Sequence, residues 1–246
     1  MRLRIRDRLL WGLEISSGSR AYPAAKLFAW TPVGYSRRKY RDLLHRLIRI
    51  GQIQQLIIDG QVQLRLTASG RELLLKNFPV LQLQGKTWDG FWRIVIFDIP
   101  ESKRKQRDAL RRALKKMGFG RLQDSSYISP HELSQPFLDW LQAKGLPGSV
   151  IILEAKQKHL GNPKNLAAKV WSLASLAASY RHLIERLTTR FGIKEVKKRE
   201  DWLKKIHQEY LQIILTEPLL PQELLPADWP AAKCLKFLLG AGVVKG

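Results

Sequence analysis

Basic side chains and helical apolar spacing coincide between Ser36 and Gly51, and this is the strongest chemical signal in the sequence. The apolar residues recur three and four positions apart: Tyr40, Leu43, Leu44, Leu47 and Ile48. This spacing predicts an amphipathic helix with a cationic outer face, which can neutralise phosphates or bond guanine edges. The predicted DNA-contacting residues are Ser36, Arg37, Arg38, Lys39, Arg41, His45, Arg49 and, further along, Arg65. A solvated face on a helix that only covers a core is the alternative.

The elements around this helix predict a winged helix-turn-helix at residues 1–78. Ser36 is a suitable N-cap, and Gly51 is a suitable helix terminator. Asp59-Gly60 is a strong hairpin signal between two β-rich runs. The predicted strands are Ile53 to Ile58 and Val62 to Leu66, and the wing would bring Gln61, Gln63 and Arg65 to the DNA. Three other helices are predicted. The first carries Ile5, Leu9 and Leu13 and ends before Gly18. The second runs from Pro23 to Phe28, and the third runs from its cap, Thr67, to Lys76.

Residues 88–158 predict a ferredoxin-like α/β plait. A buried-strand pattern extends from Trp92 to Ile99 and stops at Pro100. The next helix is predicted to be capped by Ser102 and halted by Gly118, and its core side carries Leu110, Ala113, Leu114 and Met117. The remaining predicted elements are a strand at Gly120 to Leu122, a strand near Tyr127 and Ile128, a helix from Ser134 to Lys144 and a strand from Val150 to Glu154.

Two features of this middle region bear on chemistry. Asp98 ends a buried strand, where a carboxylate can hold a divalent ion that supports phosphodiester hydrolysis. Its sequence neighbours are Glu101 and Asp124, so a metal site would need a dimer mate, and capping of the following turn or helix is the favoured interpretation. The following helix also carries a basic stripe that either tracks a phosphate backbone or is simply solvated: Lys103, Arg104, Arg107, Arg111 and Lys115.

Residues 164–246 are predicted to form a helical C-terminal domain. One long heptad-like seam extends from Leu166 to Phe191, and a basic stretch from Lys194 to Arg199 leads to a second helix. The second helix carries Leu203, Ile206, Tyr210 and Ile213, with His207 expected to be structural. A turn-rich segment with Pro218, Pro221, Pro226 and Pro230 precedes a short helix from Ala231 to Leu239.

The amino-acid composition excludes several classes of protein and favours others. The chain has 246 residues, 43 Lys+Arg against 21 Asp+Glu, and a net charge of +22, which favours a polyanionic partner. Its 45% hydrophobic content excludes a disordered basic tail. Cys234 is the only cysteine, which excludes a disulfide framework and a Cys-rich zinc site. No apolar run spans a bilayer and no cofactor motif stands out, so we expect a cytoplasmic protein with no cofactor and no membrane partner.

Three stretches together resemble the PaaX family of transcriptional regulators: Gly34 to Leu74, Trp92 to Pro130, and Ile206 to Leu238 with its LLPADWP run. The resemblance implies a dimeric repressor of an aromatic-acid catabolism operon with an acyl-CoA effector. The central domain of that family also resembles the small CRISPR-associated plait nuclease, whose strand-end aspartate matches Asp98.

Three hypotheses remain. The first is a sequence-specific regulator that binds double-stranded DNA as a homodimer and is released by an acyl-CoA-like effector. The second is a metal-dependent nuclease that uses Asp98 from two subunits. The third is an architectural protein that coats nucleic acid without sequence preference.

Overall fold

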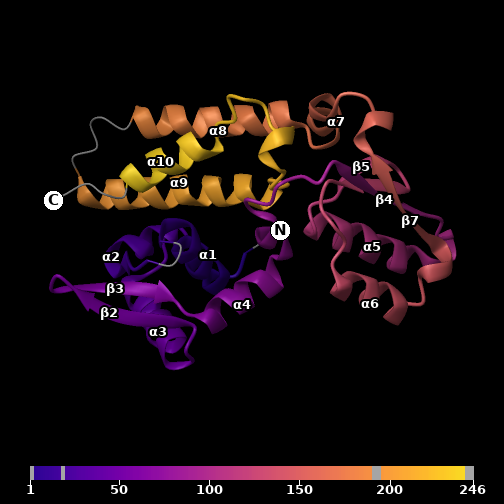
Figure 1. Ribbon diagram of the computed structural model, residues 1–246. Coiled ribbons are helices and arrows are strands. Elements are labelled where there is room, and N and C mark those ends of the chain that lie inside the picture. Colours follow the sequence, from indigo (N-terminus) through magenta and orange to yellow (C-terminus); the bar gives the residue numbers. More distant parts are fainter. Residues whose placement is uncertain (1–2, 18–19, 190–194, 242–246) are drawn as a thin grey trace. The chain divides into compact units, whose positions relative to one another are not determined.

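The computed structural model describes residues 3–17, 20–189 and 195–241. The chain divides into two compact units (Figure 1). Unit 1 consists of Met1–Asn77, Leu176–Thr216 and Pro230–Gly246, and unit 2 consists of Phe78–Ser175 and Glu217–Trp229. Helices combine with two antiparallel sheets, so the predicted α+β class is confirmed. No helix of the described residues is long and apolar enough to cross a bilayer.

The N-terminal part of unit 1 is built from short helices and a three-stranded sheet. The strand order is β1-β3-β2, and β2 and β3 form the hairpin. The helices are α1 (Ile5–Ser17), α2 (Ala24–Leu27), α3 (Arg37–Arg49) and α4 (Ala68–Asn77), with a 3-10 turn at Phe28–Trp30. The strands are β1 (Tyr22–Pro23), β2 (Ile53–Ile58) and β3 (Gln61–Leu66). The predicted helices and hairpin are present, whereas the short β1 was not predicted.

Local sequence signals set the element ends in this region. The Ser36 hydroxyl accepts a hydrogen bond from the Lys39 backbone N–H at 3.2 Å and caps α3. Gly51 ends that helix with a φ of 70°. Asp59 and Gly60 both have positive φ, 49° and 69°, as a two-residue hairpin turn requires. The Thr67 hydroxyl accepts from the Gly70 N–H at 3.1 Å, so the predicted cap of α4 is confirmed.

The C-terminal helices complete the core of unit 1. They are α9 (Val196–Thr216), α10 (Ala231–Ala241) and most of α8 (Leu173–Thr188). Trp30 is fully buried, and its ring meets the rings of His207 and Tyr210 edge-on at 4.4 and 6.3 Å between centroids. His207 is 3% exposed and its Nδ1 lies 2.7 Å from the Leu203 carbonyl oxygen, so it is a structural histidine, as predicted.

The prediction of one long helix from Leu166 to Phe191 is wrong. The segment forms α7 (Pro163–Val170) and then α8, and the chain turns between them where Ser172 has a φ of 50°. A positive φ at a residue other than glycine cannot continue a helix, although the apolar spacing continues across the break. Phe191, Lys194 and Gly18, which were also part of the predictions, lie outside the described residues.

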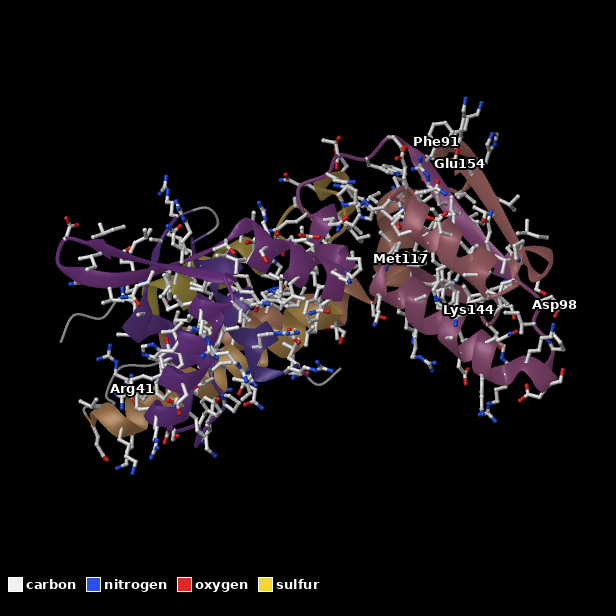
Figure 2. The ribbon with its side chains drawn as sticks, turned by 90° about the horizontal axis from the view of Figure 1, so that it is seen from below. Arg41, Phe91, Asp98, Met117, Lys144 and Glu154 are labelled. Atoms are coloured by element: carbon white, nitrogen blue, oxygen red, sulfur yellow. The ribbon has the colours of Figure 1, made fainter. Side chains whose placement is uncertain are left out.

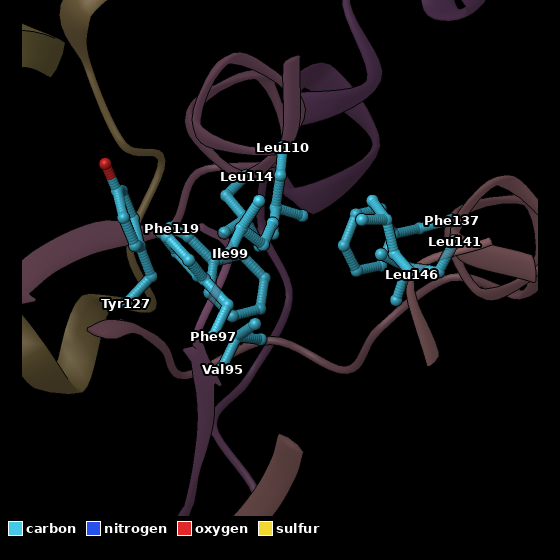
Figure 3. Close-up of a cluster of buried hydrophobic side chains, with 10 residues drawn as sticks. All are labelled: Val95, Phe97, Ile99, Leu110, Leu114, Phe119, Tyr127, Phe137, Leu141 and Leu146. Atoms are coloured by element: carbon cyan, nitrogen blue, oxygen red, sulfur yellow. The ribbon is translucent and has the colours of Figure 1, made fainter. Parts of the chain in front are cut away.

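Unit 2 contains a four-stranded antiparallel sheet of order β5-β6-β4-β7. The strands are β4 (Phe91–Phe97), β5 (Gly120–Gln123), β6 (Ser126–Ser129) and β7 (Val150–Lys156). The helices α5 (Arg104–Lys116) and α6 (Gln135–Ala143) pack on one face, where Leu114 and Phe137 belong to the same buried cluster as Val95, Phe97 and Tyr127 (Figure 3). On the other face, Trp92 and Ile128 pack with Ala167 of α7 and Leu224.

Ser102 does not cap α5, so that prediction is wrong. A 3-10 turn at Glu101–Lys103 stands before the helix, which begins at Arg104 with Lys103 as its N-cap residue and no side-chain cap. Ser102 therefore lies inside the turn that leads into the helix.

Candidate nucleic-acid interface

The inner face of α3 anchors this helix in unit 1. Tyr40, Leu43, Leu44 and Leu47 are buried. The Tyr40 hydroxyl donates to the Ala24 carbonyl at 2.7 Å, and its ring meets Phe28 edge-on at 5.1 Å. Burial raises the pKa of Tyr40 far above its usual range, so this hydroxyl stays protonated and keeps donating. The helix is therefore held by packing and by a hydrogen bond to α2.

The outer face of α3 is cationic. Arg38, Arg41, His45 and Arg49 are all exposed (Arg41 is labelled in Figure 2). Successive residues of a helix are turned by 100°, so Arg38, His45 and Arg49 lie opposite the buried stripe and Arg41 flanks them. Within the described parts of the chain, no carboxylate oxygen lies within 4.0 Å of Arg38, Arg41 or Arg49. These guanidinium groups are available to an external anion, with Asp42 as the one acidic residue of the helix.

Arg37 is placed differently from the other predicted residues. Its guanidinium forms an ion pair with Glu200 of α9 and lies 4.0 Å from the centre of the Phe28 ring. The Lys204 ammonium lies 4.1 Å from the same ring and is almost fully buried. Arg37 therefore attaches the N-terminus of α3 to α9, a role that sequence reasoning could not find because Glu200 is 163 positions away.

An open hollow of about 720 Å³ lies along one flank of α3. The N-terminal segment of the chain closes its other side. The cations that line it are Arg4, Arg6, Lys39, Arg46 and Arg49. Arg6 is held by Asp7 at 3.3 Å. The sequence analysis included Lys39 and Arg49 but missed Arg4, Arg6 and Arg46. The position of Arg46, off the apolar seam of α3, was a usable signal, whereas Arg4 precedes α1 and belongs to no pattern.

The hairpin presents the predicted polar residues on one face. Gln61, Gln63 and Arg65 alternate along β3, and the Arg65 guanidinium donates to the Gln54 side-chain oxygen of β2 at 2.7 Å. Near the turn, three aliphatic side chains are exposed beside Asp59 and Gln61: Ile57, Ile58 and Val62. The hairpin therefore offers one cation, Arg65, and exposed aliphatic side chains next to its turn.

Asp98 is exposed at the end of β4 and is labelled in Figure 2. Its backbone N–H donates to the Ser149 carbonyl at 3.0 Å. The capping interpretation is wrong, because Pro100 is the N-cap residue of the following turn and Lys103 that of α5. In the described part of the chain, no group of three or more His, Cys, Asp or Glu side chains could hold a metal ion.

Both units combine helices with a sheet, and the exposed cationic face of α3 lies in the N-terminal part of unit 1. Residues 85–167 match the family described as the PaaX protein central Cas2-like domain, and residues 171–239 match that of the PaaX-like protein C-terminal domain. The chain belongs to the PaaX family, as the sequence analysis predicted.

The chain is also similar to one curated protein in sequence and to one solved structure in fold. Transcriptional repressor PaaX of Escherichia coli (strain K12) is 26% identical over 213 residues, which are 80% of this chain and 65% of that protein. The matched region thus spans less than two thirds of the relative's length. Uncharacterized protein Rv0674 from Mycobacterium tuberculosis has a similar structure, with a TM-score of 0.58 and 21% identity over 96% of this chain and 91% of the other. At that identity the likeness concerns the fold alone.

Proposed function

We propose that this protein is a transcriptional repressor that binds operator DNA through α3. The observation that carries the proposal is the outer face of that helix, where Arg38, Arg41 and Arg49 are exposed and free of carboxylate partners among the described residues. Arginine in the major groove bonds guanine through two donors, and at the groove edges it neutralises phosphates. The repressor name of the Escherichia coli relative supports the same function.

The arrangement of unit 1 supports a winged helix-turn-helix as the DNA-binding element. Helices α1, α2 and α3 precede the β2–β3 hairpin, and α3 occupies the position of a recognition helix. His45 would lie at the groove with the three arginines, and Ser36 and Lys39 would meet phosphates near the helix N-terminus. Arg65 would reach the neighbouring backbone. Arg37 was predicted with these residues; because its guanidinium pairs with Glu200, we propose that it positions the N-terminus of α3.

We propose that unit 2 is a ferredoxin-like plait through which two protomers join. The sheet order β5-β6-β4-β7 corresponds to the second, third, first and fourth strands of a β-α-β-β-α-β unit. The helices α5 and α6 are the two helices of that unit. A homodimer would hold two copies of α3 at a set separation and bind a pseudo-palindrome. An acyl-CoA effector, implied by the family resemblance, would favour one dimer geometry over another and thereby release DNA. The protein would act without catalytic residues and without a cofactor.

The test is selection of bound sites from a random duplex library with the full chain. A repressor of this kind yields an enriched pseudo-palindrome whose half-sites lie about one helical turn, 10–10.5 base pairs, apart or at a multiple of that distance. Specific duplexes bind roughly 10³-fold or more tightly than random ones. Recovery of no shared sequence would contradict the proposal and favour the architectural hypothesis.

A further inference from the structure

The positive charge of the middle of the chain is concentrated on one helix. Helix α5 carries seven basic residues and one acidic residue, Asp108. The rest of residues 79–158 contains seven basic and seven acidic residues, so it is electrically balanced. The excess charge of this region is therefore a property of the α5 surface and not of the region as a whole.

The basic side chains of α5 divide into two groups. The first group serves the fold: Arg107 pairs with Glu101 at 2.7 Å and is one-fifth exposed. Arg111 donates to the Asp124 carbonyl at 3.0 Å and lies 5.9 Å from the Phe97 ring centre. Both residues belong to the stripe predicted either to track a phosphate backbone or to be solvated, and both attach the edges of α5 to neighbouring parts of unit 2.

The second group faces away from the core. Lys105, Arg112 and Lys116 are exposed on the side of α5 opposite the buried Leu110 and Leu114. Among the described residues, no carboxylate oxygen lies within 4.0 Å of these three cations. Arg112 and Lys116 are also one helical turn apart, a like-charge spacing that costs helix stability. A surface that serves only solubility would gain from an acid at one of these positions.

We propose that Lys105, Arg112 and Lys116 form a second DNA-contacting surface, which binds the phosphate backbone of a duplex without reading its sequence. This proposal rests on duplex DNA being the ligand of the protein, as proposed for α3. At a rise of 1.5 Å per residue, the three side chains span about 16 Å along α5. Phosphates of one strand recur about every 3.4 Å along the duplex axis, so this stripe is long enough to follow several of them. Lysine and arginine with no base-reading neighbours give affinity without specificity.

The test compares two triple variants of the full chain by fluorescence anisotropy over a salt series. The α5 variant is K105Q/R112Q/K116Q, since glutamine removes the charge and keeps good helix propensity. The matched control is K158Q/K164Q/K169Q, which removes three exposed lysines of the same unit. Each protein is titrated with a random duplex and with the duplex recovered by selection, and its folding is checked by circular dichroism and thermal unfolding.

The α5 variant is expected to reduce the slope of log K against log salt concentration by up to about 2.7, which is about 0.9 for each lost phosphate contact. Its affinity falls roughly tenfold or more near 0.1 M salt, by the same factor for both duplexes, because phosphates carry no sequence information. The control variant changes the slope less. Loss of discrimination without loss of slope would overturn the proposal, as would equal effects of the two triple variants.

Two further outcomes distinguish this proposal from the sequence-specific function of α3 and from binding to an anionic membrane. If the parent binds random and selected duplexes equally but the α5 variant still lowers the slope, the sequence-specific function fails and the phosphate surface stands. If the α5 variant binds duplexes like the parent but no longer binds phosphatidylserine vesicles that the parent binds, the surface serves an anionic membrane and the proposal is overturned.

Discussion

Arg38 and Arg37 are adjacent on α3, and the structure gives them different roles that alanine substitution separates. Arg38 is exposed on the outer face and has no carboxylate partner among the described residues. Arg38→Ala should therefore weaken binding to the selected duplex by about 1–3 kcal/mol, or roughly 5–150-fold, if it removes a bidentate base contact. It should leave the unfolding temperature unchanged within experimental error.

Arg37→Ala should have the opposite pattern. Its cation–π contact with Phe28 contributes about 0.5–1 kcal/mol at a half-exposed site. Its ion pair with the partly exposed Glu200 contributes a further 0.2–1 kcal/mol or so. The expected loss is about 1–2 kcal/mol of folding free energy, or roughly 2–4 °C in Tm per kcal/mol for a chain of this size.

The assays are anisotropy titration with the selected duplex and thermal unfolding of each variant. Lys76→Ala is the control, since it removes one exposed positive charge of unit 1 from α4. If Arg38→Ala bound the selected duplex like the parent, α3 would not be the recognition helix. If Arg37→Ala lost as much DNA affinity as Arg38→Ala while remaining as stable as the parent, the division of roles on this helix would be wrong.

Two other predictions concern His207 and Asp98. Burial, assisted by the nearby positive charge of Arg8, lowers the pKa of His207 to about 4, against about 6.5 in the unfolded chain. The unfolded state therefore takes up the proton first, and the free energy of unfolding should fall by roughly 1.5 kcal/mol between pH 6.5 and pH 5. Urea unfolding of H207Q, in which position 207 does not titrate, should show a smaller decline. Purified protein should cleave neither DNA nor RNA with Mg²⁺ or Mn²⁺, and cleavage that Asp98→Ala abolishes would instead favour a nuclease.

Features that depend on a few neighbouring residues were predictable from the sequence. Ser36 and Thr67 cap the helices that follow them, and Asp59-Gly60 turns the hairpin. Each of these signals acts within four residues, so the chemistry that produces it is visible in the sequence itself. The buried stripe of α3 was predictable for the same reason, because helical periodicity places its members on one side.

Features that depend on distant partners were not predictable. The apolar spacing from Leu166 onward is continuous, yet the chain turns at Ser172. Ala167 then packs in unit 2, whereas Tyr180 and Leu183 are buried in helix α8 of unit 1. The spacing of apolar residues predicts which side of a helix is buried but not which core that side packs against. One continuous apolar stripe can therefore belong to two units. The division into domains at 1–78, 88–158 and 164–246 stays a prediction.

The basic residues show the same limit, because charge patterning alone does not say which of them have partners within the fold. On α3 and on α5, the cations adjacent to the buried stripe meet carboxylates, carbonyls or aromatic rings of the same unit, as Arg37 and Arg111 do. The cations farthest from the stripe, such as Arg38 and Arg112, have no carboxylate within 4.0 Å in the described chain. A long side chain at the edge of a core can bury its stem and satisfy its guanidinium on neighbouring elements. On the opposite side of α3 and α5, an acid on the same helix would have to supply the partner, and neither Arg38 nor Arg112 has one within 4.0 Å among the described residues. The angular distance from the apolar stripe therefore separates the arginines that contact other parts of the fold from those whose guanidinium groups are available to an external anion.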